Sequence, residues 1–370
     1  MSIIIMDGGG SGMKRLVAAG IGIPAVIVLL GLGIVWFSPS AQDAVMRRVV
    51  ASNMGSYDAV LNEDALHVVL CGTGSPMPDP DRAQACAIVY AGGRVFLVDS
   101  GLGGWDRLAR FQLPVGGLSG VLITHFHSDH ISGIPDIALN SWAAGRREAL
   151  ALYGPPGVER IAQGFDIAYS LDDGYRIAHH GAEFFAEEGA NYLPVVVDVP
   201  DRDTDVTVFD EDGVKITAFR VSHEPVDPAY GYRVDYKGRS AVFSGDTKKD
   251  SNVKKFGAGA DVLIHEALAT HMVALLEEGL EHRGDRRAKV MHDIPDYHAT
   301  PVDAAKVANE AGVKLLVYTH IVPRLPNALA ERVFLRGVSH VRGEGVSLGY
   351  DGLYLELPAG SDRIVERDLR

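Results

Sequence analysis

The chain has little cysteine and no excess of positive charge. Only two cysteines, Cys71 and Cys86, occur in 370 residues, which excludes a zinc ribbon or a disulfide framework. They lie on successive predicted strands, where one disulfide could form, but we expect two buried thiols. The net charge of -13 provides no global basic field for phosphate backbones. A nucleic-acid ligand would therefore need a local basic patch.

Charge is also missing from one long stretch near the N-terminus. Residues 16–37 carry no charged side chain and follow Lys14 and Arg15. This run is long enough to span a bilayer core and longer than the apolar core of a cleaved secretory signal. Because flanking cations stay on the cytoplasmic side, we expect a single-pass membrane protein whose remaining chain is extracytoplasmic, on the periplasmic side, or secreted if the segment is cleaved.

The rest of the sequence alternates between strand and helix patterns. Strand-like runs at 66–71, 85–90 and 94–99 are followed by helical periodicity at 102–112, 131–145, 155–167, 268–280, 302–311 and 327–336. Gly92 and Gly93 predict a hairpin turn between the second and third strands. This order indicates a layered α/β domain over 64–370, after a short segment at 1–15, the anchor at 16–37 and a linker at 38–63.

Three histidines and one aspartate stand within six positions, as His125-Phe126-His127-Ser128-Asp129-His130. They follow the apolar run 120–124, which has the pattern of a buried strand. Imidazole nitrogen and carboxylate oxygen are the ligands that zinc and similar divalent cations prefer. A chance cluster among 14 histidines would not be expected to show this spacing. Four ligands exceed what one tetrahedral ion usually takes from one segment, so the motif suggests two ions.

Other apolar strands also end in a residue that can bind metal. His223, Asp246, the pair His265-Glu266 and His320 each follow such a run. If these strands pack side by side, their ends lie along one rim, where layered α/β folds form sites. The sequence therefore predicts that the residues meet in space.

Together these motifs strongly resemble the metallo-β-lactamase superfamily, over about residues 65–357, and 98–101 (Val-Asp-Ser-Gly) looks like that family's Asp-x-Gly motif. The resemblance implies an αββα sandwich with a dinuclear site. It places one ion on His125, His127 and His223, the other on Asp129, His130 and His320, and Asp246 as the bridge between both. Two adjacent cations would make hydroxide from a shared water near neutral pH and stabilise charge on the attacked centre, so the expected reaction is hydrolysis. We expect two zinc ions, although manganese or iron can also occupy such ligands.

Two further motifs, 265–267 (His-Glu-Ala) and 297–300 (Tyr-His-Ala-Thr), resemble loops of the ribonuclease Z and arylsulfatase-like branches. By that resemblance Glu266 and His298 help the departing oxygen, and with Asp129 they are the catalytic candidates. The alternative is that Glu266 only caps a helix start and that His298 is a surface histidine.

The interval from His223 to Asp246 bears on the choice of branch. In ribonuclease Z it holds a long arm for tRNA, whereas here it reads as one compact hairpin. With the acidic charge and the anchor, this favours a small anionic sulfate or phosphate ester as substrate and makes nucleic acid an unexpected partner. The alternative is a ribonuclease Z-type endoribonuclease acting on tRNA 3′ ends. The segments 165–190 and 271–297 are expected to form caps over the site or a homodimer contact.

Overall fold

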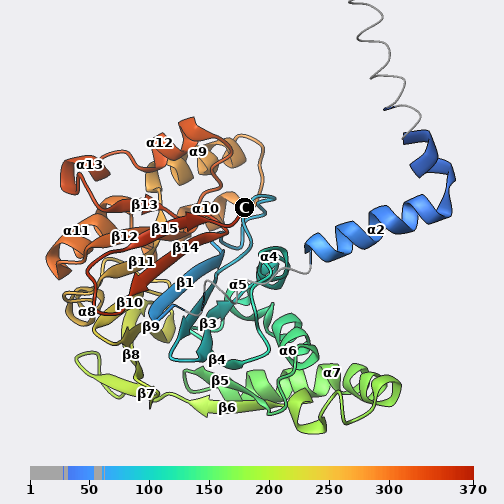
Figure 1. The fold of residues 1–370 in the computed structure, drawn as a ribbon. Coiled ribbons are helices and arrows are strands. Elements are labelled where there is room, and N and C mark those ends of the chain that lie inside the picture. The colour runs from blue at the N-terminus through green and yellow to red at the C-terminus, as the bar shows by residue number, and fades with distance from the viewer. Residues whose placement is uncertain (1–27, 29–31, 54–60, 62) are drawn as a thin grey trace, which may run out of the picture. The chain divides into compact units, whose positions relative to one another are not determined.

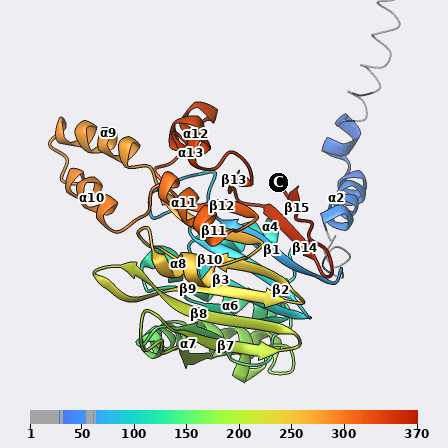
Figure 2. The ribbon, with the colours of Figure 1, turned by 90° about the vertical axis from the view of Figure 1, so that its left-hand side faces the viewer.

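Two β-sheets packed face to face form the core of the protein, with helices on both outer faces (Figures 1 and 2). The computed structural model describes residues 28, 32–53, 61 and 63–370. The chain divides into two units, Met1–Ser56 and Tyr57–Arg370, and the sandwich is the second. These layers confirm the predicted αββα sandwich.

The first sheet has eight strands in the order β15-β14-β1-β2-β3-β4-β5-β6. Along β1, Leu66, Val68 and Leu70 pack between the sheets, whereas Val69 and Cys71 pack beneath the helices. Both faces of the strand are buried, as the continuous apolar run requires. The strands are β1 (Ala65–Gly72), β2 (Cys86–Ala91), β3 (Arg94–Ser100), β4 (Leu118–Leu122), β5 (Leu150–Gly154), β6 (Tyr192–Val196), β14 (Leu353–Pro358) and β15 (Val365–Asp368).

The second sheet has seven strands in the order β13-β12-β11-β10-β9-β8-β7. They are β7 (Asp205–Glu211), β8 (Val214–His223), β9 (Val226–Tyr236), β10 (Arg239–Phe243), β11 (Val262–Leu268), β12 (Leu315–Val322) and β13 (Val346–Leu348). Strand β9 is antiparallel to both β8 and β10, and β10, β11 and β12 are mutually parallel. The carboxyl ends of β8, β10, β11 and β12 therefore reach the same edge, as the sequence predicts.

In the described part of this unit the helices are α4 (Gly104–Arg110), α5 (Ser128–Ile131), α6 (Ile134–Ala143), α7 (Val158–His180), α8 (Ser251–Phe256), α9 (Thr270–Glu281), α10 (Ala288–Asp293), α11 (Pro301–Ala311), α12 (Ala328–Phe334) and α13 (Val338–Val341), with 3-10 turns η1 (Glu187–Ala190) and η2 (Ile294–Asp296). The six predicted helical segments are present as α4, α6, α7, α9, α11 and α12, and the described chain has further short helices that the sequence did not predict. The helix predicted at 155–167 continues to His180, and its added turns expose Leu171 and Tyr175. Figure 2 shows α9 and α10 standing away from the sheets.

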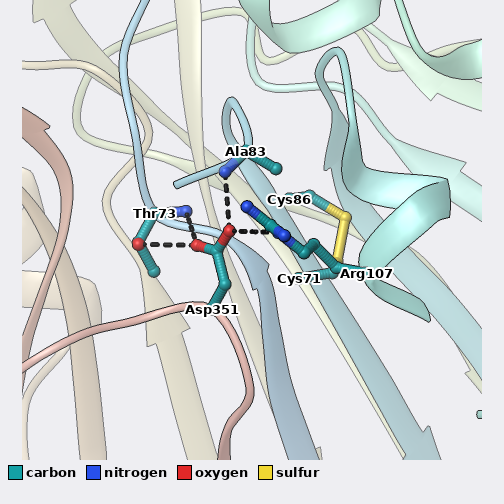
Figure 3. The surroundings of a disulfide bond; sticks show 6 residues. All are labelled: Cys71, Thr73, Ala83, Cys86, Arg107 and Asp351. Carbon is teal, nitrogen blue, oxygen red and sulfur yellow. Dashed lines mark hydrogen bonds and ion pairs between the residues drawn. A yellow bond between two sulfur atoms is a disulfide. The ribbon is translucent and has the colours of Figure 1, made fainter. Parts of the chain in front are cut away.

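Cys71 and Cys86 form a disulfide, so the prediction of two buried thiols is wrong (Figure 3). The antiparallel pairing of β1 with β2 contains an irregularity between Leu70 and Gly72. Both sulfur-bearing side chains lie in the same buried cluster, and their Cα atoms are 5.0 Å apart, within the usual span of a disulfide. The bond closes the loop that joins the two strands.

The N-terminal prediction needs correction. Most of the anchor predicted at 16–37 lies outside the described residues. In the part of the chain that the structure describes, no helix is both long enough and apolar enough to cross a membrane. The prediction of a single-pass membrane protein with an extracytoplasmic domain is therefore wrong for the described chain. The predicted linker also begins with a helix, α2 (Pro39–Asn53), whose sequence starts with proline and contains no glycine.

Candidate metal centre

The residues singled out as metal ligands meet at one edge of the sandwich. His125 and His127 follow β4, and Asp129 and His130 lie in α5. His223 ends β8, Asp246 follows β10, and His320 lies within β12 near its carboxyl end. Two groups of their ligand atoms each have all members within 4.8 Å of one another: His125, His127, His223 and Asp246 in one, and Asp129, His130 and His320 in the other. A third group of this kind joins Asp246 and His320 to His298. The candidates therefore meet in space, as the strand-end pattern predicts, while their division between two ions stays a prediction.

Asp246 lies between the two groups. Its Oδ2 is 3.4 Å from Nε2 of His130 and 3.4 Å from Nε2 of His320. The same oxygen is 3.8 Å from Nε2 of His125 and 3.9 Å from Nε2 of His223. One carboxylate oxygen thus faces imidazoles of both groups, as a bridging ligand must.

Hydrogen bonds fix which nitrogen of two imidazoles faces the centre. Nδ1 of His130 donates to Oδ2 of Asp99 at 2.8 Å, and Nδ1 of His223 donates to the carbonyl oxygen of Tyr297 at 2.9 Å. Both histidines therefore turn Nε2 toward Asp246, and an acceptor of this kind raises the basicity of a metal-binding imidazole. Asp99 is itself held by the amide and hydroxyl of Thr124, at 2.8 Å and 2.9 Å. The sequence marked Asp99 only as a structural motif.

The donor set fits divalent metal ions. Nε2 of His130 is buried, has no hydrogen-bond partner in the described structure, and lies 3.5 Å from Oδ2 of Asp129 as well as beside Asp246. Leaving a buried polar atom unpaired costs about 1–3 kcal/mol. A cation between this nitrogen and the two carboxylates would satisfy all three groups, and imidazole with carboxylate is a donor set for zinc, manganese or iron.

The pKa values describe the same charge distribution without metal. Burial alone would raise the pKa of Asp246, but the His320 and His130 imidazoles outweigh it and hold the pKa well below the ordinary value. Burial alone would lower the pKa of His320, but Asp246 and Asp129 raise it to about 9. The pKa of His130 is also raised well above its ordinary value, because Asp246 and Asp99 overcome its burial. Without metal, protons on His320 and His130 thus provide positive charge at the places where metal ions would provide it.

Glu266 and His298 lie beside this centre, where the sequence places them. Oε1 of Glu266 accepts from the backbone amides of Ala299 at 2.8 Å and Thr247 at 3.2 Å, and Nδ1 of His298 is 3.3 Å away. The His298 ring stacks on that of His320 at a centroid distance of 5.5 Å. Glu266 therefore joins the loop after Asp246 to the loop that carries His298.

His265 behaves differently from the other strand-end residues. Its Nδ1 is 2.6 Å from the backbone oxygen of its neighbour Glu266, and it belongs to none of the potential metal groups in the described structure. Alternation along β11 explains the difference, because adjacent residues of a strand point to opposite faces. The expectation that this strand end supplies a site residue holds for Glu266 alone.

Comparisons with known proteins agree with the fold and the motifs. Residues 94–321 match the family model described as a beta-lactamase superfamily domain. A ribonuclease Z from Mycobacterium marinum is 40% identical over 263 residues, which are 70% of this chain and 88% of that relative. A ribonuclease Z from Mycobacterium tuberculosis is 37% identical over 263 residues, 70% of this chain and 87% of that relative.

Solved structures share the fold. The human tRNase Z short form has a TM-score of 0.56 and 23% identity, covering 79% of this chain and 99% of that chain. The metallo-beta-lactamase fold protein YhfI from Bacillus subtilis has a TM-score of 0.57 and 18% identity, covering 79% of this chain and 100% of that chain.

The relatives correct the predicted partner. Proteins named ribonuclease Z act on RNA, so the expectation of a small anionic ester and no nucleic acid is wrong. The compact hairpin between His223 and Asp246 is present as β9 and β10. With its family model, its relatives and its two-sheet fold in agreement, this chain belongs to the metal-dependent beta-lactamase superfamily and is similar to its ribonuclease Z members.

Proposed function

We propose that this protein is a zinc-dependent endoribonuclease of the ribonuclease Z type, which hydrolyses a phosphodiester bond at the 3′ end of precursor tRNA. The observation that carries the proposal is a predicted two-ion ligand set gathered at one edge of a chain that is 40% identical to a ribonuclease Z. Neither the ligand set nor the sequence similarity is sufficient alone, since the superfamily fold supports several hydrolytic reactions.

In this proposal His125, His127 and His223 would hold one zinc ion and Asp129, His130 and His320 would hold the other, with Asp246 as a further ligand. When bound, the ions supply an activated water and withdraw charge from the phosphate. The protein's own contribution is to orient the imidazoles before metal binds. Asp99 and the Tyr297 carbonyl orient His130 and His223, so little rearrangement is required on metal binding.

His298 is proposed to give a proton to the ribose oxygen that leaves. Its ring stacks on His320 and so borders the second ligand group. Glu266 accepts two backbone amides and lies 3.3 Å from Nδ1 of His298, which fixes the direction of the ring. A positioned proton donor of this kind contributes about 10² to 10⁴ in rate.

A local cationic surface supports RNA as the substrate despite the net charge of -13. Arg332 and Arg336 are exposed on and just after α12, and neither has an ion-pair partner in the described part of the chain. They line a groove of about 770 Å³ together with Arg342. The helix packs on β12 through the rings of Tyr318 and Phe334, and β12 carries His320. Phosphates held there would lie over the same sheet that presents the ligands.

The test is a comparison of substrates with the full chain loaded with zinc. A precursor tRNA with a 3′ trailer, an unrelated single-stranded RNA and bis-nitrophenyl phosphate are incubated with the protein, and the RNA ends are mapped. We expect one cut in the precursor at the 3′ end of the mature sequence, and none by Asp246→Asn. Hydrolysis of bis-nitrophenyl phosphate with an intact precursor would contradict the proposal.

A further inference from the structure

His320 sits at an irregular point of its strand. In the pairing of β11 with β12, Glu266 is opposite Thr319 and the next residue, Ala267, is opposite Ile321. His320 is therefore the extra residue of a β-bulge, and its φ is 44°, in the left-handed region that non-glycine residues rarely adopt. Such a conformation costs on the order of 1 kcal/mol or more and persists only when the surroundings hold it.

The buried carboxylate of Asp351, just before β14, provides that hold on the C-terminal side of the bulge. Figure 3 shows its contacts with Thr73, Ala83 and Arg107. The amide of Ile321, directly after His320, donates to the carbonyl oxygen of Thr73 at 2.9 Å. Oδ1 of Asp351 accepts from the Thr73 amide at 3.0 Å and from its hydroxyl at 2.8 Å. Oδ2 accepts from the amide of Ala83 at 2.6 Å and from Nε of Arg107 at 3.0 Å. Asp351 thus fixes both ends of the loop that carries Thr73.

The N-terminal side of the bulge is held by the same assembly. The carbonyl oxygen of Tyr318 accepts from the amide of Gly349 at 2.9 Å, an approach so close that a Cβ on Gly349 would lie 2.2 Å from that oxygen. The guanidinium of Arg82 donates to the Thr73 hydroxyl and to the Gly349 carbonyl, each at 2.6 Å. The backbone before and after His320 is therefore tied to one loop.

Asp351 itself lies outside the metal centre. It belongs to none of the groups of potential metal ligands in the described residues and is only 3% exposed. Burial raises its pKa, although the Ala83 amide, the Thr73 donors and Arg107 oppose this effect. A carboxyl group buried at such a cost is expected to have a defined role. Three of its four hydrogen bonds come from the segment that contacts the bulge, and the fourth comes from Arg107 of α4.

We propose that Asp351 is a positioning residue that acts through Thr73 to hold His320 in its bulge, and so sets the geometry of the second metal position alone. The inference rests on the proposed two-ion function. Loss of Asp351 relaxes the bulge and displaces Nε2 of His320 from Asp129 and Asp246. The first position, on His125, His127 and His223, does not depend on this loop.

The test is zinc binding to the full-length protein, by calorimetric titration with metal content measured in parallel. Asp351→Asn keeps the size of the side chain but loses the acceptors for Ala83 and Arg107. We expect two tight ions in the wild type, and in the variant one ion with unchanged affinity and one bound 10- to 100-fold more weakly. The kcat for precursor tRNA should fall while the KM stays constant.

Asp261→Asn is the matched control. Asp261 is a buried carboxylate, 4% exposed, that accepts from Arg239 and from the Ser240 amide at the opposite end of β11. This variant should lose stability without changing either zinc affinity. The disulfide keeps the Thr73 loop closed in Asp351→Asn, and Thr73→Val, which removes only the hydroxyl, is the milder second variant.

The outcomes separate the two proposals. Equal weakening of both ions in Asp351→Asn, or unchanged affinity for both in Asp351→Asn and Thr73→Val, would overturn the positioning role and leave the proposed function intact. A wild-type protein that binds fewer than two ions would overturn both. Selective loss in Asp261→Asn as well would show a general stability effect and also overturn the positioning role.

Discussion

Removal of metal should make the stability of this protein depend on pH in a defined window. Without metal, Asp246 and Asp129 overcome burial and raise the pKa of His320 to about 9, against 6.5 in an unfolded chain. The folded state therefore binds this proton more tightly than the unfolded state. The resulting stability is fully present below pH 6.5 and is lost as the pH rises through about 9.

The size of the effect follows from the shift. A change of one pKa unit corresponds to 1.36 kcal/mol, so the difference between 6.5 and about 9 gives about 3 kcal/mol for His320. His130, whose pKa is also raised, acts in the same direction. His125 has a pKa lowered by burial and by the charge of His130, so it destabilises the fold only below pH 6.5, outside the window. A loss of 3 kcal/mol lowers the Tm by roughly 5–10 °C.

Scanning calorimetry of chelator-treated protein from pH 6.5 to 9.5 measures this loss. The zinc-loaded protein is the control and should not lose stability over the same range, because the imidazole nitrogens then bind metal instead of protons. Asp246→Asn should flatten the slope of the metal-free protein, since Asp246 contributes most to raising the pKa of His320. A metal-free wild type with constant Tm across the window would refute the reasoning.

Three other predictions concern separate parts of the molecule. His298→Ala should lower kcat for precursor tRNA by about 10² to 10⁴ at unchanged zinc content, and a loss of zinc would instead place His298 among the ligands. Replacing Cys71 and Cys86 by serine should lower the free energy of unfolding by about 3 kcal/mol in urea titrations, as expected for a loop of this length, whereas an unchanged midpoint would contradict this. Replacing Arg332 and Arg336 by glutamate should weaken binding of precursor tRNA and reduce the salt dependence of that binding. Hydrolysis of bis-nitrophenyl phosphate is the control activity and should not change.

The sequence was sufficient for the layers and for the edge at which the candidate ligands meet. Alternating apolar runs predict the strands, and His223, Asp246 and His320 each stand where such a run ends. Because strands of one sheet that run in the same direction end at the same edge, their meeting point could be predicted without distances.

Features that depend on strand register could not be predicted in the same way. The irregular pairing of β1 with β2 brings Cys71 and Cys86 together, and the bulge at His320 appears only when β11 and β12 are aligned. The carboxylate of Asp351 reaches Thr73 from 278 positions away, and no local pattern marks such a contact. The predicted partner is wrong for another reason: the short interval after His223 describes one loop and not the whole binding surface.

The most direct test of the central claim is a zinc titration of the metal-free protein in which bound zinc and cleavage of precursor tRNA are measured on the same samples. The account predicts that cleavage stays low while the first ion binds and rises with the second, because Asp246 faces both ligand groups. Full cleavage with one bound ion, or an intact precursor with two, would contradict it.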